Sequence, residues 1–213
     1  MRRVTVIDYG IGNLLSVSRA LERCGAEVLL TSDPLLITRA DRLVLPGVGA
    51  FADGMAGLRE RGLIDPIREY ARSGRPLLGI CLGMQMMLDT SEEFGSHEGL
   101  GLIPGKVSAI PVTGVDGRPH KIPHIGWNEL MPPSPATNWK GTILEDIPTN
   151  AAAYFVHSYA AVPAHPEHRL ADCHYDGQVI SAVIRSGSTY GCQFHPEKSG
   201  ETGLRILRRF ISI

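Results

Sequence analysis

The N-terminal half of the chain alternates short, mostly apolar runs with longer segments that are apolar along one side only. The apolar runs predict strands at residues 4–8, 27–31, 42–45 and 77–80. The one-sided segments predict helices at residues 13–24, 50–62 and 65–73, and Gly25 ends the first of them. Apolar strands joined by amphipathic helices are typical of an open, mostly parallel sheet with helices on both faces.

The pattern changes from residue 106 onward, where prolines and glycines are frequent and the apolar runs are short. Turn dipeptides such as Asp116-Gly117 and Asp176-Gly177 favour hairpins, so we expect antiparallel additions in this C-terminal half. A further strand is predicted at residues 190–194 and a final helix at residues 202–213. The sequence therefore predicts an α/β fold in which residues 1–213 form a single domain.

Composition narrows the possible partners and compartment. The 213 residues carry 21 Lys and Arg against 22 Asp and Glu, so no broad positive surface for nucleic acid is expected. Before Asp8 only residues 4–7 are continuously apolar, which is too short for a secretory segment, and no run approaches the length of a membrane span. The four cysteines are scattered without a C-x-x-C pair. We expect reduced thiols and a cytoplasmic location.

Cys81 is the first candidate for chemistry. It ends the apolar run 77–80, has Gly79 and Gly83 two places to either side, and precedes helix-compatible residues at 84–89. This is the strand, sharp turn and helix of a nucleophile elbow, in the form G-x-C-x-G. The glycines leave room where backbone meets backbone, and a helix start lowers the pKa of a thiol. The alternative is a buried structural cysteine.

A base and its orienting group follow the strand at residues 190–194, as His195-Pro196-Glu197. Because a proline favours extended backbone before it, His195 and Glu197 are expected to project to the same side. Glu197 would then hold one imidazole nitrogen while the other faces Cys81, which is the arrangement of a catalytic triad.

The same tripeptide recurs as His165-Pro166-Glu167. This copy lies in a polar, proline-rich loop, and no apolar run leads into it. A sheet presents catalytic groups at strand ends, so we choose His195 over His165 as the base.

Three other segments are weaker candidates. Gly10 and Gly12 follow the first strand, but Leu15 stands where a dinucleotide fingerprint needs its third glycine. The loop PGVG at residues 46–49 follows the third strand and could supply a second oxyanion donor opposite the elbow. The eight histidines offer no metal set, since Pro123 interrupts the helix that would align His120 with His124.

These residues resemble the class I glutamine amidotransferases. Five segments narrow the resemblance to the family of glutaminase subunits of imidazole glycerol phosphate synthase, an enzyme of histidine biosynthesis. They are DYGIGNL (8–14), PGVGAF (46–51), PHIGWN (123–128), YFVHSY (154–159) and HPEKSG (195–200). The resemblance covers the whole chain, and no catalytic position departs from the family pattern.

The resemblance implies that Cys81 attacks the side-chain amide of glutamine to form a thioester, with His195 and Glu197 completing the triad. The oxyanion would be held by the amides of Leu82 and of Val48 or Gly49. The resemblance also implies the residues that bind the ends of the substrate, which are Gly49, Gln85, Glu93 and the backbone of Ser158 and Tyr159. For Glu93 alone, a solvated surface position is the alternative.

The family also implies a partner, because nothing else in the chain could use the ammonia. The expected partner is a cyclase subunit with a TIM-barrel fold, joined in a heterodimer, and no cofactor or metal is implied. Asn13, Trp127 and Lys198 lie in the segments that distinguish this family and are candidates for the interface. For Trp127 the alternative is packing in the core.

Other classes of protein remain open at this point. A glutaminase subunit of another class I amidotransferase, or a stand-alone cysteine hydrolase, would share the elbow and the triad. A non-catalytic binding module on the same fold would normally have lost Cys81 or His195, and both are present. Glutamate release from glutamine, with and without a cyclase subunit, distinguishes these classes.

Overall fold

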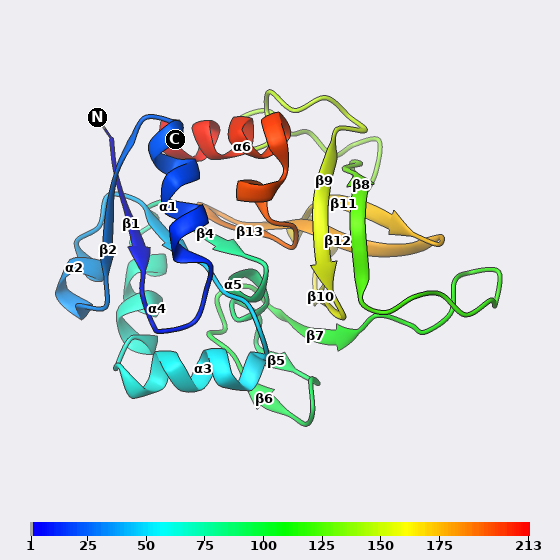
Figure 1. The fold of residues 1–213 in the computed structure, drawn as a ribbon, viewed down its shortest axis with the longest axis horizontal. Coiled ribbons are helices and arrows are strands. Elements are labelled where there is room, and N and C mark those ends of the chain that lie inside the picture. The colour runs from blue at the N-terminus through cyan, green and yellow to red at the C-terminus, as the bar shows by residue number, and fades with distance from the viewer. Residues whose placement is uncertain (1) are drawn as a thin grey trace.

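The apolar runs form one central sheet in the computed structural model, which describes residues 2–213 (Figure 1). In spatial order its strands are β11 (Arg169–Tyr175), β12 (Gln178–Ser186), β13 (Thr189–Cys192), β4 (Leu77–Ile80), β3 (Leu43–Leu45), β1 (Arg2–Ile7) and β2 (Ala26–Thr31). From β13 to β2 every pairing is parallel, whereas β11 and β12 join antiparallel. The predicted α/β class with a mostly parallel sheet is confirmed.

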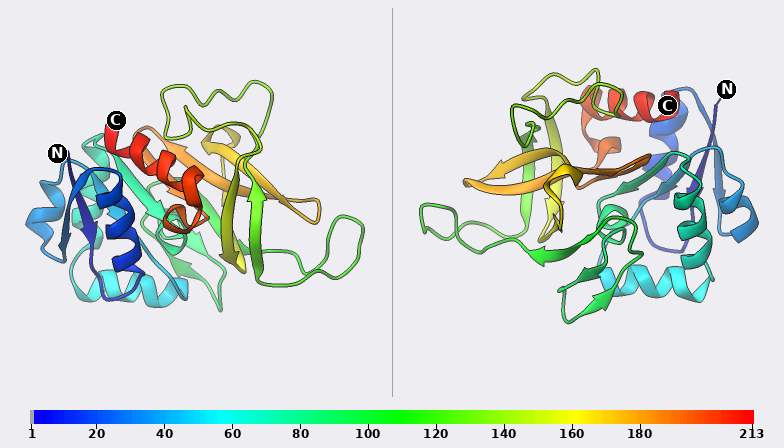
Figure 2. Two further views of the ribbon diagram at one scale, coloured as in Figure 1. Left: turned by 45° about the horizontal axis from the view of Figure 1, so that its top comes forward. Right: turned by 180° about the vertical axis from the view of Figure 1, so that it is seen from behind.

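The sheet separates two hydrophobic cores, as the alternation along β3 shows. Val44 packs in the core beneath α1 (Leu14–Arg23) and α6 (Gly200–Ser212). Its neighbours Leu43 and Leu45 pack in the opposite core, with α3 (Phe51–Glu60), α4 (Ile64–Arg72) and the short α2 (Pro34–Thr38). Successive strand residues face opposite sides, so a run that is apolar throughout needs helices on both faces. Figure 2 shows this covering from two further directions.

The antiparallel additions predicted for the C-terminal half are also present. A four-stranded sheet contains β10 (Tyr159–Pro163), β7 (Gly105–Ala109), β5 (Thr90–Ser91) and β6 (His97–Glu98). A separate ribbon pairs β8 (His124–Glu129) with β9 (Ala152–His157) and stands beside one end of the central sheet (Figure 1). Asp176-Gly177 turns the β11–β12 hairpin with positive φ at both residues, as its dipeptide predicted.

The helix expected at residues 84–89 is wrong in its bounds. Helix α5 spans only Leu82–Gln85. The next three residues are fully buried and have no polar side to expose. The carbonyls of Met86 and Met87 accept hydrogen bonds from Leu100 and Leu102, so a neighbouring loop takes the acceptors that a longer helix would need.

None of the helices among residues 2–213 is long and apolar enough to cross a membrane. The longest, α6, has 13 residues and is buried along one side only. That residues 1–213 form one domain stays a prediction.

Gly83→Ala tests how tightly the elbow packs. A Cβ at Gly83 would lie 1.8 Å from the Leu45 carbonyl oxygen, so the backbone itself must move. We expect a loss of about 2 kcal/mol or more in the free energy of unfolding, measured by urea denaturation. Gly54→Ala is the matched control, because there the nearest atom is the Met86 sulfur at 2.7 Å, on a flexible side chain. Equal losses in the two variants would contradict the assignment.

Candidate active site

Parallel pairing of β4 with β13 places the two candidate catalytic segments side by side. Ile80 pairs with Cys192, and the amide of Cys81 donates to the Cys192 carbonyl at 2.7 Å. Both strands end here, at the carboxyl edge of the sheet, where α/β proteins bind ligands. Cys81 follows the end of β4, and His195 lies three residues after the end of β13, so the two residues emerge at the same edge of the sheet.

The turn at Cys81 has the strained geometry of an elbow. Cys81 has φ 54° and ψ −109°, a left-handed conformation that costs energy for a residue with a Cβ. Gly79 faces the other side of the same turn, and a Cβ there would lie 2.7 Å from the Gly83 carbonyl oxygen. Both glycines are thus required by close backbone contact, as the sequence pattern predicted.

His195 and Glu197 are in contact, although by a different route from the one expected. His195 is extended, but residues Pro196–Lys198 form a 3₁₀ turn instead of continuing the extended backbone. Through this turn the imidazole Nδ1 lies 2.7 Å from a Glu197 oxygen, and the two side chains are 4% and 1% exposed. The extended geometry proposed for residues 195–197 is wrong beyond His195.

Burial disfavours the charged form of His195, but its partners outweigh this effect. Hydrogen bonds with Cys81 and Glu197, and the charges on both, raise the pKa of His195 to about 9. The imidazole is therefore held between the thiol and the carboxylate, in the order that a triad requires.

The duplicate tripeptide has nearly the same local backbone. His165 is also extended and also leads into a 3₁₀ turn, Pro166–His168. It differs in surroundings, since both His165 and Glu167 are exposed. Of the two histidines, His195 lines a pocket with Cys81 and His165 does not. That His195 is the catalytic base stays a prediction.

A pocket of about 270 Å³ opens at Cys81, at the small end of ligand pockets and suited to a single amino acid. It brings together all the residues that the family resemblance named for the substrate or the oxyanion. The lining residues are Val48, Gly49, Cys81, Leu82, Gln85, Glu93, Val156, His157, Ser158, Tyr159 and His195.

Glu93 is half-buried and not a freely solvated side chain. Its carboxylate accepts a hydrogen bond of 2.6 Å from the amide of Phe51, the first residue of α3. A carboxylate at this position also suits the helix dipole. Glu93 thus ties the loop at residues 46–50 to the opposite wall of the pocket.

This loop is held at both ends, by Tyr9 at Pro46 and by Glu93 at Phe51, and its middle makes no such contact. Buried Tyr9 donates to the Pro46 carbonyl at 2.9 Å, and a Cβ on Gly47 would lie 2.6 Å from the same hydroxyl. Val48 is 39% exposed, and Gly49 has φ 91° with open space around it. Within the described part of the chain, no acceptor is bonded to the amides of Val48 and Gly49, so both remain available to a ligand.

Sequence reasoning missed three residues of this site. Gln193, fully buried beside the nucleophile, directs its amide nitrogen to the Cys81 sulfur at 3.9 Å. His157 lines the pocket, and Tyr9 anchors the loop. The register of β13 against β4 would have identified Gln193, because it stands next to Cys192, but one sequence does not reveal register.

The three candidate interface residues lie on neighbouring elements. Asn13 caps α1 by accepting from the Ser16 amide at 3.3 Å, Lys198 is exposed on the 3₁₀ turn, and Trp127 is 57% exposed on β8. The 3₁₀ turn packs against both α1 and β9. The exposure of Trp127 rules out core packing for this side chain. An interface role for the three residues stays a prediction.

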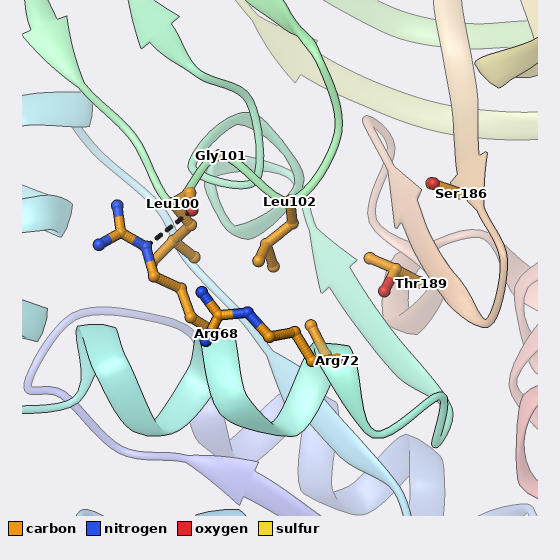
Figure 3. A pocket seen from close by; sticks show the side chains of 8 residues that line it. Arg68, Arg72, Leu100, Gly101, Leu102, Ser186 and Thr189 are labelled. Carbon is orange, nitrogen blue, oxygen red and sulfur yellow. Dashed lines mark hydrogen bonds between the residues drawn. The ribbon is translucent and has the colours of Figure 1, made fainter.

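A larger hollow, of about 430 Å³, lies at the opposite end of the sheet (Figure 3). It borders Thr189, where β13 begins, and contains no cysteine or histidine. Arg68 in its wall donates to the Leu100 carbonyl at 3.0 Å and so supports the loop after β6. Among residues 2–213 no group of three potential metal ligands is found.

Comparison with known proteins adds independent evidence. Residues 5–213 match the family model described as glutamine amidotransferase class-I. The chain is 61% identical, over the full length of both, to imidazole glycerol phosphate synthase subunit HisH 1 of Legionella pneumophila strain Lens. It is 48% identical to the HisH subunit of Moorella thermoacetica, covering 99% of this chain and 94% of the relative.

Solved structures show the same fold at low identity. A structure titled glutamine amidotransferase aligns with a TM-score of 0.71 and 18% identity, covering 99% of each chain. A chain of PurLQS from Thermotoga maritima aligns with a TM-score of 0.72 and 20% identity, over 100% of this chain and 99% of that one.

Removal of the thiol tests the coupling between Cys81 and His195. Cys81→Ala deletes both the hydrogen bond and the charge that raise the pKa of His195, so this pKa should fall from about 9 toward 6.5, by at least about one unit. Histidine ring NMR across a pH titration measures it. Cys24→Ala changes a half-buried thiol that does not contribute to the pKa of His195, so it should leave the value near 9. An unchanged pKa in Cys81→Ala would separate the two groups.

Proposed function

The chain belongs to the class I glutamine amidotransferases, and we propose that it is the glutaminase subunit of an imidazole glycerol phosphate synthase in histidine biosynthesis. It hydrolyses glutamine to glutamate and ammonia. The observation that carries this proposal is the meeting of Cys81, His195 and Glu197 at one edge of the sheet. Full-length identity of 61% to a named subunit of this enzyme supports the choice within the family.

In the first step Cys81 attacks the side-chain carbonyl carbon of glutamine. His195 takes the thiol proton and later gives it to the departing nitrogen, so that ammonia leaves and a thioester remains. Glu197 accepts from Nδ1 of His195 and so keeps the other ring nitrogen directed toward the thiol. Water then attacks the thioester, with His195 as base, and releases glutamate.

The tetrahedral oxyanion formed in both steps needs donors. The amide of Leu82 opens α5 and has no acceptor within its own helix. A second donor comes from Val48 or Gly49, whose amides are free and border the same pocket. One such donor is worth about 10²–10³ in rate.

The charged ends of glutamine are held at the mouth of the pocket. We assign the α-amino and carboxylate ends of the substrate to a set of pocket residues, which are Gly49, Gln85, Glu93 and the backbone of Ser158 and Tyr159. Gln85 already donates from Nε2 to the Tyr159 carbonyl at 2.9 Å.

The relatives are named as subunits, and a partner subunit is therefore expected for this chain. We propose a cyclase with a TIM-barrel fold that forms a heterodimer with it and receives the ammonia. Asn13, Trp127 and Lys198 are our candidates for the contact. The four cysteines are free thiols, consistent with the cytoplasm.

The repeated tripeptide provides a test of the catalytic base. His195→Ala should lower glutaminase activity by about 10³ or more, because the triad acts as a unit. His165→Ala changes an exposed copy of the same motif and should stay near the parent rate. Glutamate release is measured for both variants in the presence of the cyclase, and equal losses would overturn the assignment.

Partner dependence follows from the loop at residues 46–49. Since no acceptor among residues 2–213 is bonded to the amides of Val48 and Gly49, we expect glutaminase activity to rise at least about tenfold when the cyclase and its nucleotide substrate are added. Steady-state glutamate release with and without the cyclase measures this.

The control for that experiment is Cys81→Ala. It should release no glutamate, yet the complex should still make product from ammonium salt, since the acceptor site lies on the partner. A rise of less than tenfold in the parent chain would mean that the loop is already organised before the partner binds.

A further inference from the structure

We propose that His157 is a positioning residue for the glutamine pocket, which acts by fixing the backbone carbonyl of Tyr159. The inference rests on the proposed glutaminase function and adds to it a residue outside the triad. The polar contacts of His157 are with His124 and Tyr159. It lies at the end of β9, where the chain turns through Ser158 into β10.

The corner at Ser158 joins two sheets and lines the pocket. β9 belongs to the ribbon with β8, whereas β10 pairs with β7. Ser158 connects β9 to β10 and is paired in neither ladder. Its carbonyl accepts from the Ile110 amide at 2.9 Å. A corner of this kind needs side-chain bonds to hold its direction, because the regular ladder is interrupted.

His157 supplies such a bond. Its Nδ1 lies 2.9 Å from the Tyr159 carbonyl oxygen, two residues ahead in the chain. The same oxygen accepts from the Gln85 amide nitrogen at 2.9 Å. One carbonyl therefore joins the corner of the pocket wall to α5, the helix that begins directly after Cys81.

The contacts continue from Gln85 to the nucleophile. The same Gln85 nitrogen lies 3.1 Å from the Gln193 side-chain oxygen, and the Gln193 amide nitrogen is directed to the Cys81 sulfur at 3.9 Å. Both glutamines are buried. Displacement of the Tyr159 carbonyl would thus loosen Gln85, the side chain assigned to the substrate, before it disturbed Cys81.

His157 is protonated at Nδ1 and can therefore donate to the Tyr159 carbonyl. A carbonyl oxygen can only accept, so Nδ1 must carry the hydrogen. Burial lowers the pKa of His157 to about 3, against the opposing effect of the bond to Tyr159. The ring is therefore neutral with its hydrogen on Nδ1, and the bond persists throughout the physiological pH range.

His124 supports the ring from the opposite strand. The two histidines pair across β8 and β9, and Nδ1 of His124 lies 3.0 Å from Nε2 of His157. His124 stacks between Phe155 and Tyr175, with ring centroids 5.1 and 4.1 Å away. This packing sets the plane of His124 and limits the rotation of His157.

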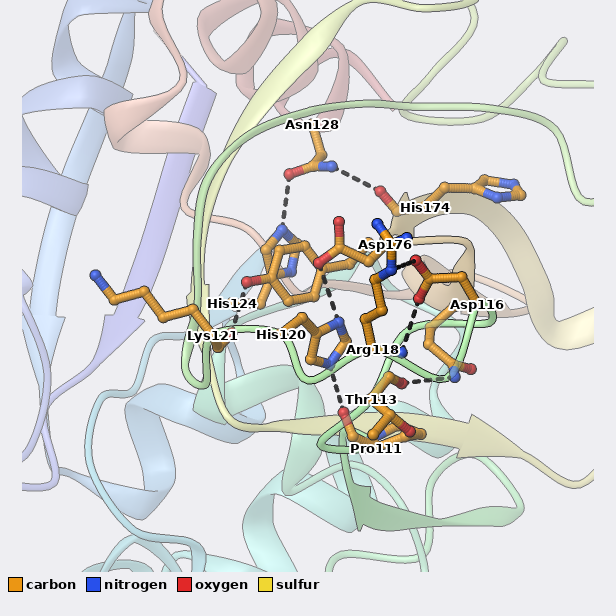
Figure 4. A network of polar contacts seen from close by, with 12 residues as sticks. Pro111, Thr113, Asp116, Arg118, His120, Lys121, His124, Asn128, His174 and Asp176 are labelled. Atoms are coloured by element: carbon orange, nitrogen blue, oxygen red, sulfur yellow. Dashed lines mark hydrogen bonds and ion pairs between the residues drawn. The ribbon is translucent and has the colours of Figure 1, made fainter.

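The outer end of the network is drawn in Figure 4. Asn128 donates to the His174 carbonyl at 2.7 Å, so its oxygen faces Nε2 of His124, also at 2.7 Å. Each neutral ring thus spends its single hydrogen on an outer bond. The contact between Nδ1 of His124 and Nε2 of His157 therefore contains no hydrogen while both rings are neutral. Protonation of either ring would supply one, but burial lowers the pKa of both histidines. The bond from His157 to Tyr159 is present in both states.

The test compares His157→Ala with His157→Asn in the complex with the cyclase. Alanine removes the donor, so we expect the KM for glutamine to rise about tenfold while kcat changes less than about threefold. Asparagine carries an amide nitrogen near the place of Nδ1, and it should restore the KM to within about threefold of the parent. His174→Ala, which removes an exposed ring outside the network, should match the parent.

Two further readouts separate this role from a general loss of structure. Synthesis from ammonium salt should keep the parent rate, because it bypasses glutamine binding. Alkylation of Cys81 by iodoacetamide should also keep the parent rate, because the reagent enters the pocket but needs only the thiol and not the contact through Gln85. An unchanged KM in His157→Ala, or no recovery in His157→Asn, would overturn the proposal. A parent complex that releases no glutamate would instead overturn the glutaminase function itself.

Discussion

The parallel pairing of β4 with β13 is the constraint on which the rest of the site depends. These strands are far apart in sequence, and a backbone hydrogen bond of 2.7 Å from Cys81 to Cys192 joins them where both end. The bond determines which residues can reach the thiol. His195 arrives at the carboxyl edge with Cys81, and Gln193 is placed against the sulfur. A slip of one residue would turn each side chain to the other face of the sheet.

Close backbone packing keeps the nucleophile in a conformation that it would not adopt alone. Cys81 has a positive φ, which costs energy of order 1–3 kcal/mol in a residue with a Cβ. The surrounding contacts offset that cost, since Gly83 lies directly against the Leu45 carbonyl and Gly79 against the turn itself. The same tight region extends to Gly47 and Tyr9, and it ends at Val48. Rigidity at the thiol and freedom at the neighbouring amides therefore meet within one pocket.

Buried polar groups in the site are arranged in short chains, each ending at the reacting region. Glu197 acts on His195, and His195 on Cys81. His157 acts on the Tyr159 carbonyl by a hydrogen bond, and the packed ring of His124 limits the rotation of His157. In a low-dielectric interior an unpaired polar group is costly, so each member restricts the next. The first chain concerns the chemistry of the thiol, whereas we assign the second to the binding of glutamine.

Local patterns of apolar runs, glycines and turns were enough to predict the α/β class and the sharp turn at Cys81, and to select His195 as the candidate base. These patterns misjudged the helix after the elbow, which ends at Gln85, since the carbonyls of Met86 and Met87 accept from the later loop that contains Leu100 and Leu102. His165 and His195 have the same local backbone, and only their places in the fold separate them. Gln193 and His157 could not be identified from local patterns either. Gln193 depends on the register of β13 against β4, and His157 on the corner between two sheets, and both arise from long-range pairing.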